Sequence, residues 1–235
     1  MKFSAPLGFT TVVPFLALCA TQNTAVKVSS SAIPWVKIDG QLNRISAGSS
    51  TNVWGVAAND EIFRYTGDDS NPWVQIPGAL TDIGAGADGT VWGVSSIGDI
   101  WRYTGDEGFP WVKINGQLNR ISVGSSTNIP GALTDIGAGA DGTVWGVSSI
   151  GDIWRYTGDE GFPWVKINGQ LDQISVGSST SVWGVAPNDE IFRYTGDDSS
   201  PWVQIPGALT DTGAGADGTV WGVSSIGEIW RWIGD

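Results

Sequence analysis

Several residue types that common catalytic mechanisms need are absent or scarce in this chain of 235 residues. It has no histidine, which excludes mechanisms that need an imidazole, such as the serine triad, and excludes histidine-ligated zinc. Its single cysteine, Cys19, cannot form an internal disulfide or a cysteine-rich metal site. We therefore expect no metal site, no cofactor and no catalysis of these kinds.

Basic residues are also scarce. Lysine and arginine number 12 against 24 aspartates and glutamates, so the net charge is −12. Nucleic acids and anionic membranes attract clusters of basic side chains, and we expect neither as a partner. Charged residues make up only 15% of the chain and hydrophobic residues 41%, which indicates a folded protein rather than a disordered one.

Residues 1–33 differ in composition from the rest. After Lys2, the stretch from Phe3 to Ala20 is uncharged and mostly apolar, as in a secretory signal peptide with a cleavage site near Ala20. Proline and glycine interrupt this stretch, and it is at the short limit for crossing a bilayer. We predict a signal-like or disordered segment over residues 1–33 and a secreted protein without a membrane span. A cytoplasmic protein is the alternative.

The 34 glycines and 14 tryptophans belong largely to an internal repeat. Two copies of 38 residues, Pro34–Asn71 and Pro72–Phe109, are similar in sequence. Further copies are Pro163–Ser200 and Pro201–Asp235, the last without its tail. Alternate copies resemble each other best, so the repeats are of two types. The motifs PWV and VWGV each occur five times.

The copy that starts at Pro110 is incomplete. After Asn128 the chain continues with Ile129-Pro130, which belongs to the start of the following copy. Compared with Val53–Gln75, 23 residues are missing. A six-repeat ancestor with an internal deletion accounts for this, and a mis-joined gene is the alternative.

Each copy predicts four short strands, rich in Val, Ile, Trp, Phe or Tyr and separated by turn residues. In the first copy they are Trp35–Ile38, Leu42–Gly48, Asn52–Ala57 and Glu61–Thr66. Four strands in about 40 residues, repeated in tandem, are typical of a β-propeller blade. A solenoid is the alternative, but its terminal repeats should be polar caps.

Side-chain size predicts where each strand lies. Leu42–Gly48 ends in small residues and suits the crowded axis, whereas the PWV strand suits the outer edge. Because the first strand, Pro34–Ile38, is of the outer type, it can complete the last blade and leave no open edge. This gives five complete blades and leaves Gln117–Asn128 over. We expect either five blades with a looped-out insertion, or six positions with one blade reduced to a single strand. The second would expose a blade face and favour oligomerisation.

The pattern W-x-x-I-x-G-x-L-x-x-I-S-x-G, followed by V-W-G-V and I-[FW]-R-Y, resembles the tectonin repeat of tectonins and fish-egg lectins. The resemblance extends from Pro34 to the last residue. It implies an all-β, six-bladed propeller lectin of four-stranded blades without catalysis, recognising lipopolysaccharide or O-methylated sugars of bacterial or nematode surfaces in innate defence. The missing 23 residues depart from this pattern and bring the number of complete blades to five.

Repetition itself favours binding over catalysis. Every polar group recurs from copy to copy, whereas a glycosidase needs two differently tuned carboxylates about 5–9.5 Å apart. Near-identical sites around a ring instead raise avidity, by about 10²–10⁴-fold when several glycans engage together. We therefore predict a multivalent, non-catalytic carbohydrate-binding protein, and a protein-interaction scaffold that uses the same rim is the alternative.

Three sets of repeated side chains are candidates for the grooves between adjacent blades. The first is the tryptophan of each VWGV motif, namely Trp54, Trp92, Trp145, Trp183 and Trp221. The second is one arginine per copy, namely Arg64, Arg102, Arg155, Arg193 and Arg231. The third lies between the second and third strands and comprises Asn59, Asp60, Asp99, Asp152, Asn188 and Asp189. Tryptophan can stack on a sugar ring and arginine can donate to its hydroxyls. The alternatives are that the tryptophans pack between blades and the arginines pair with carboxylates of neighbouring turns.

Overall fold

The computed structural model describes residues 34–123, 133–159 and 163–234. The described residues all belong to one compact unit, which extends from residue 33 to residue 235. The signal-like segment predicted for residues 1–33 lies outside the described residues. The described part of this unit contains twenty β-strands and no helix.

The twenty strands form five four-stranded antiparallel sheets, the blades, whose strands follow one another from the inner to the outer edge. Blade 1 contains β2 (Arg44–Ser49), β3 (Asn52–Val56), β4 (Ile62–Tyr65) and β5 (Trp73–Ile76). Blade 2 contains β6 (Asp82–Ala85), β7 (Val91–Val94), β8 (Asp99–Tyr103) and β9 (Trp111–Gln117). Blade 3 contains β10 (Leu133–Ala138), β11 (Val144–Ser148), β12 (Asp152–Tyr156) and β13 (Trp164–Gln170). Blade 4 contains β14 (Gln173–Ser178), β15 (Ser181–Val185), β16 (Ile191–Tyr194) and β17 (Trp202–Ile205). Blade 5 contains β18 (Asp211–Ala214), β19 (Val220–Val223), β20 (Glu228–Trp232) and β1 (Trp35–Gln41).

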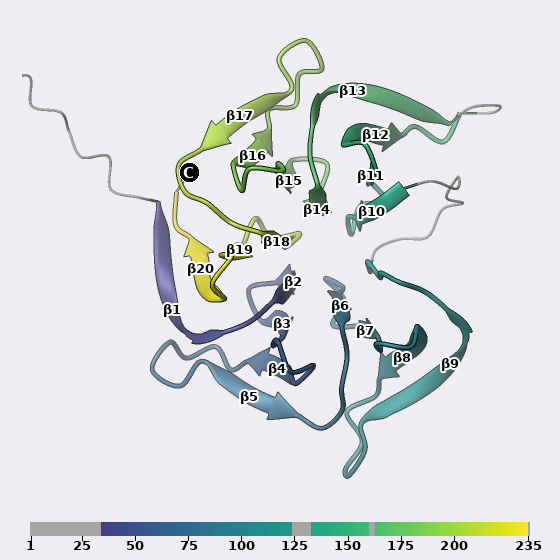
Figure 1. Cartoon of the computed structure of the whole chain (residues 1–235), viewed down its shortest axis with the longest axis vertical. Helices are drawn as coiled ribbons and strands as arrows, with labels where there is room; N and C mark the ends of the chain where they lie inside the picture. Colours follow the sequence, from purple (N-terminus) through teal and green to yellow (C-terminus); the bar gives the residue numbers. More distant parts are fainter. Residues whose placement is uncertain (1–33, 124–132, 160–162, 235) are drawn as a thin grey trace, which may run out of the picture. The chain divides into compact units, whose positions relative to one another are not determined.

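The five sheets surround a common axis, with the small-residue strands inside and the PWV strands outside (Figure 1). β1 pairs with β20, so that Trp35 lies opposite Trp232. The predicted propeller of five complete blades, and its closure by the first strand, are thus confirmed. The closure leaves blade 5 with four strands although the last copy ends after its third.

The glycine that follows each VWGV tryptophan leaves room for a leucine side chain of the same blade. A Cβ atom on Gly55 would lie 2.3 Å from Leu42 Cδ1, far inside van der Waals contact. The same close approach of a leucine to this glycine, at 2.2–2.3 Å, recurs in the other four blades at Gly93, Gly146, Gly184 and Gly222. Any larger residue would push the leucine out of the core, so the glycine and the leucine form one packing unit per blade.

The hydrophobic core lies between blades rather than within them. Four clusters join blade 1 to 2, blade 3 to 4, blade 4 to 5 and blade 5 to 1. Each contains an aromatic triad in which the VWGV tryptophan of one blade meets two rings of the next. At the junction of blades 5 and 1, Trp221 lies 4.8 Å from Tyr65 and 6.0 Å from Trp73, ring centre to ring centre. Tilted and edge-to-face packing at such distances stabilises the junction beyond burial alone.

Between blades 2 and 3 the described residues form no such cluster, and one inner segment stands there instead. Ile121 N donates to Asp82 Oδ2 at 2.7 Å, and Ser122 Oγ accepts from Ala138 N at 3.1 Å. Complete blades make the same two bonds to their neighbours. Residues 119–123 therefore take the place of an inner strand, as expected for a ring of six positions with one blade reduced. We call this place the open position.

Candidate functional site

Four of the five VWGV tryptophans lie in the inter-blade core. Trp54, Trp145 and Trp221 are 1% exposed and Trp183 is 2% exposed, because each is packed into its aromatic triad. Their rings are thus closed to ligands, which is the packing alternative that the sequence left open. Trp92 differs, since it is half-buried and its blade faces the open position.

Arg155 and Arg231, two of the repeated arginines, pair with carboxylates of a neighbouring turn. Arg231 binds Asp69 through two parallel hydrogen bonds of 2.8 and 2.7 Å, and Arg155 binds Asp198 in the same way at 2.9 and 2.8 Å. Tyr65 donates a further bond to Asp69. The bonds from the arginine and the tyrosine hold the pKa of Asp69 below its usual range.

Stacking on the VWGV tryptophan is common to four of the repeated arginines. The guanidiniums of Arg64 and Arg193 stack over Trp54 and Trp183 at 6.0 and 5.9 Å, and those of Arg155 and Arg231 stack over Trp145 and Trp221 at 5.5 and 5.4 Å. Arg102 is exposed and lies on the face of blade 2 toward the open position. The repeated arginines thus fall into different environments although their neighbours in sequence are alike.

Replacing Arg231 by alanine should lower the free energy of unfolding by about 1 kcal/mol, because it removes a half-exposed bidentate ion pair and a stacked cation. Arg64→Ala is the matched control. It removes the stacking alone, which is worth about 0.5 kcal/mol at an exposed site. Urea denaturation of both variants measures the difference, and equal losses would contradict a role for the Asp69 pair.

The predicted hairpin residues lie at the opposite end of the strands from the arginines. Asp60 and Asp189 occupy the tip of their hairpins with φ angles of 66° and 65°. Asp99 and Asp152 pair with Lys113 and Lys166 on the adjacent outer strand. Four residues of extended chain, about 13 Å, separate Asp60 from the arginine of its blade. The structure therefore does not bring the arginine and hairpin sets into one site.

The hairpin end instead carries a repeated cavity between complete blades. Between blades 1 and 2 it has a volume of about 300 Å³. Its lining includes Ile62, Ala79, Leu80, Ser95, Asp99, Trp101, Phe109 and Trp111. Between blades 4 and 5 the equivalent cavity measures about 170 Å³. There the equivalent side chains are Ile191, Ala208, Leu209, Ser224, Glu228, Trp230 and Trp35.

Both cavities combine an aromatic wall with a carboxylate fixed by lysine. Trp101 and Trp230 are half-buried and line these cavities. Asp99 pairs with Lys113 and Glu228 with Lys37. A flat apolar wall beside a paired acid and base, with a serine hydroxyl nearby, can stack on a sugar ring and bond to its hydroxyl groups.

A third cavity, of about 510 Å³, lies between blades 5 and 1. It has Phe63 where the other two have tryptophan, and Asn43, Asn59 and Glu61 as polar groups. Here one predicted hairpin residue, Asn59, does face a cavity. The two repeat types therefore present two kinds of cavity, as the alternating sequence indicates.

Several cavity residues are missing from the site predicted from the sequence. Trp101, Trp230, Trp111 and Glu228 are not among its candidates, nor is Lys113, which pairs with Asp99 of the cavity. A signal for them exists in the repeat itself. Copies with phenylalanine in the third strand are followed by WVQI. Copies with tryptophan there are followed by WVKI wherever another copy comes next. That pairing across two strands marks contacting side chains.

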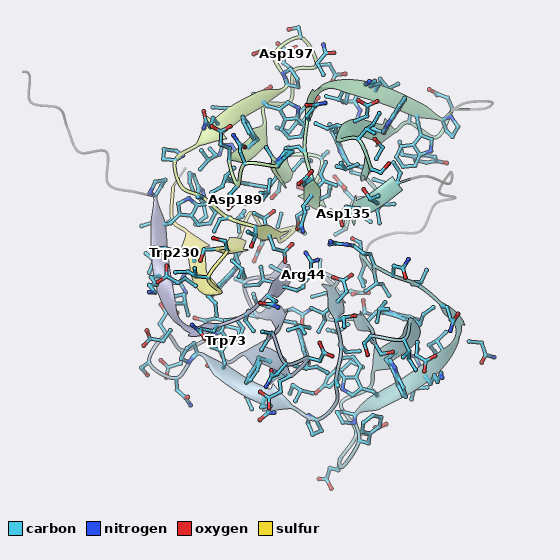
Figure 2. All side chains as sticks on the ribbon, viewed as in Figure 1. Arg44, Trp73, Asp135, Asp189, Asp197 and Trp230 are labelled. Carbon is cyan, nitrogen blue, oxygen red and sulfur yellow. The ribbon has the colours of Figure 1, made fainter. Side chains whose placement is uncertain are left out.

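The axis of the ring carries a second polar site that the sequence reasoning missed. Five charged side chains line a cavity of about 60 Å³, and Gln173 lies beside two of them, so that each inner strand or segment contributes one side chain. In order around the ring they are Arg44, Asp82, Arg120, Asp135, Gln173 and Asp211. Arg44 and Asp135 lie near the centre of the ring in Figure 2. Basic and acidic residues alternate except at Gln173, so the ring has three carboxylates and two guanidiniums.

Burial shifts the titration of this axial ring. It raises the pKa of Asp211 to about 7 and that of Asp135 to about 6. It also raises the pKa of Asp82. Arg44 lies 3.8 Å from Asp211 and Arg120 lies 3.4 Å from Asp135, and these charges only partly offset the cost of burial. With its amide nitrogen turned toward Asp211, Gln173 reaches both neighbours of this ring, and its oxygen accepts from Arg44 Nη1 at 2.6 Å.

Residues 34–123, 133–159 and 163–234 contain no helix long and apolar enough to cross a membrane. The same residues hold no cluster of three or more acidic, cysteine or histidine side chains suited to a metal ion.

The five blades and their repeated cavities define a β-propeller with candidate binding sites between its blades. The Tectonin domain model matches residues 19–131 and 125–235, and the chain belongs to the tectonin family. No curated protein sequence matches it.

Several solved structures match this chain at low sequence identity, and one of them with a TM-score above 0.5. "Structure of U3-55K" is 8% identical, with a TM-score of 0.53, and the match covers 86% of this chain and 98% of that one. YCF48 from Cyanidioschyzon merolae is 12% identical, with a TM-score of 0.37, over 86% and 68% of the two chains. YCF48 bound to D1 peptide is 19% identical, with a TM-score of 0.34, over 83% and 68%. At such identities the likeness extends to the fold alone.

Proposed function

We propose that this protein is a multivalent carbohydrate-binding lectin without catalytic activity. The observation that supports this most is the cavity repeated between blades 1 and 2 and between blades 4 and 5. Each cavity has a half-buried tryptophan and an acid–lysine pair at equivalent places. Similar shallow sites on one ring suit a repeated surface glycan, where avidity compensates for weak single contacts.

The size and polarity of the cavities favour a single sugar ring as the bound group. A volume of about 300 Å³ is at the lower end of small-molecule pockets. The aliphatic floor of Leu80 and Ala79 would accept a methyl group, which agrees with the O-methylated or lipopolysaccharide sugars implied by the tectonin resemblance. We propose bacterial or nematode surface glycans as partners, in defence, for a protein that is secreted.

The carboxylates of these cavities do not suit glycoside hydrolysis. Asp99 and Glu228 are each held by a lysine, and each cavity has only this one carboxylate among the described residues that line it. Glycoside hydrolysis needs a second carboxylate at a defined spacing. A protein-interaction propeller is the alternative function, and the open position between blades 2 and 3 favours it.

The lectin proposal is tested by a glycan array probed with the full chain, including O-methylated sugars and lipopolysaccharide fragments. The double variant Trp101→Ala with Trp230→Ala should lose at least about tenfold in apparent affinity, because stacking and avidity are lost together. Trp154→Ala is the matched control, since the same residue of blade 3 faces the open position and not a complete blade.

Selective binding that free sugar competes, lost in the double variant and kept in the Trp154→Ala control, would support the proposal. A folded chain that binds no glycan on the array would contradict it. Equal binding by the double variant would move the site away from these cavities.

A further inference from the structure

The open position is flanked by the two separated halves of a fifth aromatic triad. On blade 2, Trp92 has lost the neighbour that buries its equivalents and is half-buried. On blade 3, Tyr156 and Trp164 keep their mutual contact, 5.3 Å between ring centres. Neither half meets the VWGV tryptophan or the two rings that complete it elsewhere in the described ring. Trp164 is 5% exposed, so Trp92 and Tyr156 are the two rings of this triad that remain half-buried.

Leu118 shows what is missing at the centre of the open position. It is 42% exposed, whereas the equivalent leucines Leu42, Leu80, Leu171 and Leu209 are 1–2% exposed. Each of those four packs over the glycine of its own second strand. Leu118 has the same place in the repeat but no second strand beside it in the described part of the chain. Its exposure therefore indicates where a second strand would pack, with a glycine next to Leu118.

The register of that strand follows from the complete blades. In blade 1 the inner strand pairs Ile45 with Gly55 and Ser46 with Trp54. Residues 119–123 make the same neighbour contacts as an inner strand, so a strand added to them would set glycine opposite Ile121 and a large aromatic residue opposite Ser122. Such an aromatic residue would face blade 3 and complete the triad with Tyr156 and Trp164.

Charge adds a second requirement. Arg102 is exposed and pairs with no carboxylate among residues 34–123, 133–159 and 163–234. Its equivalents Arg155 and Arg231 each hold an aspartate from a turn of the following blade. A segment that enters the open position should therefore carry an acidic residue in the turn after its second strand, as Asp69 follows β4 in blade 1.

We propose that the open position is a docking site for a segment of a partner protein whose first strand adds to residues 119–123. That strand has the pattern aliphatic–aromatic–glycine–aliphatic, and an acidic turn follows the second strand of the segment. Backbone pairing gives affinity and alternate side chains give specificity in strand addition. A second copy of the chain has no free strand of this pattern, because all five VWGV segments belong to complete blades.

The test uses the full chain and a fluorescent peptide with the sequence of residues 52–76, which carries the missing strands. Fluorescence anisotropy should show saturable binding with one peptide per chain. A peptide with leucine in place of Gly55 should bind at least about tenfold more weakly, because the added leucine side chain would collide with Leu118.

The matched control fills the open position within the chain. A variant with a copy of residues 53–75 inserted between Asn128 and Ile129 should not bind the peptide. If that variant does not fold, Leu118→Arg serves instead, since Leu118 lies outside the four core clusters. The double variant Trp101→Ala with Trp230→Ala should bind the peptide normally, which separates this proposal from the lectin proposal.

Absence of peptide binding to the folded wild-type chain would overturn the proposal. Equal binding by the insertion variant would also overturn it, because the peptide would then bind outside the open position. Equal binding of the leucine peptide would contradict the proposed register of the added strand. A dimer in sedimentation that the insertion abolishes, without peptide binding, would assign the open position to a second copy and overturn the proposed partner.

Discussion

Replacing Trp221 by alanine should lower the free energy of unfolding by about 3–5 kcal/mol, the usual cost of deleting a buried tryptophan. Trp221 is 1% exposed, meets Tyr65 and Trp73 of the next blade, and lies under the Arg231 guanidinium at 5.4 Å. Its removal leaves a cavity at the junction that closes the ring. Chemical denaturation followed by tryptophan fluorescence measures the loss.

The matched control is Trp92→Ala, which changes the same residue of the same motif. Trp92 is half-buried and lies outside the four aromatic triads, so we expect a loss of about 1–2 kcal/mol from partial burial alone. Insertion of the missing 23 residues should raise the cost of Trp92→Ala toward that of Trp221→Ala. Equal costs for the two tryptophans in the natural chain would contradict the assignment of the core to the inter-blade junctions.

Acidification from pH 8 to pH 5 should raise the free energy of unfolding by about 2–4 kcal/mol, because two buried carboxylates bind protons more tightly in the folded chain. The pKa values of Asp211 and Asp135 are raised to about 7 and about 6, above the ordinary value of 3.8. A carboxyl group with a higher pKa in the folded chain stabilises the fold at pH values below its pKa in the unfolded chain. This contribution is lost as the pH rises through its pKa in the folded chain. Carboxylates such as Asp69 and Asp141, whose pKa values are lowered, titrate below this window.

The variant Gln173→Arg should remove most of this pH dependence. A third guanidinium restores strict alternation around the axis and favours the charged form of Asp211, which lowers its pKa. Gln173→Met keeps the size without the charge and is the control, in which the fall in stability from pH 5 to pH 8 persists. Urea denaturation at both pH values measures all three chains. An unchanged slope in the arginine variant would show that the axial ring does not set the pH dependence.

Much of the fold follows from the repeat. The four strands predicted for the first copy lie within a few residues of β1, β2, β3 and β4, and the pairing of β1 with β20 follows from the type of strand at each end. Local turn residues and strand-forming side chains suffice for this, because blades repeat the same short-range pattern. The place of residues 119–123 is one of two predicted outcomes, and sequence spacing alone could not choose between them.

The candidate site was less predictable. Trp54 and Trp101 both stand in strands with similar neighbours, yet one is buried in a junction and the other faces a cavity. Arg231 and Arg102 have similar neighbours in sequence but differ in their surroundings. The difference in each case comes from the following or preceding blade, which lies about one repeat away in sequence.

The sequence by itself determined the repeat, the strand order within a blade, the closure of the ring and the absence of imidazole chemistry. Only the tertiary structure decided which tryptophans are core, which cavities are open, and that Arg44, Asp82, Arg120, Asp135, Gln173 and Asp211 meet on the axis. The physical reason is that a strand's own residues set its pleat and turns, whereas burial and charge pairing depend on which face the neighbouring blade covers. Where that neighbour is incomplete, identical sequence motifs acquire different environments.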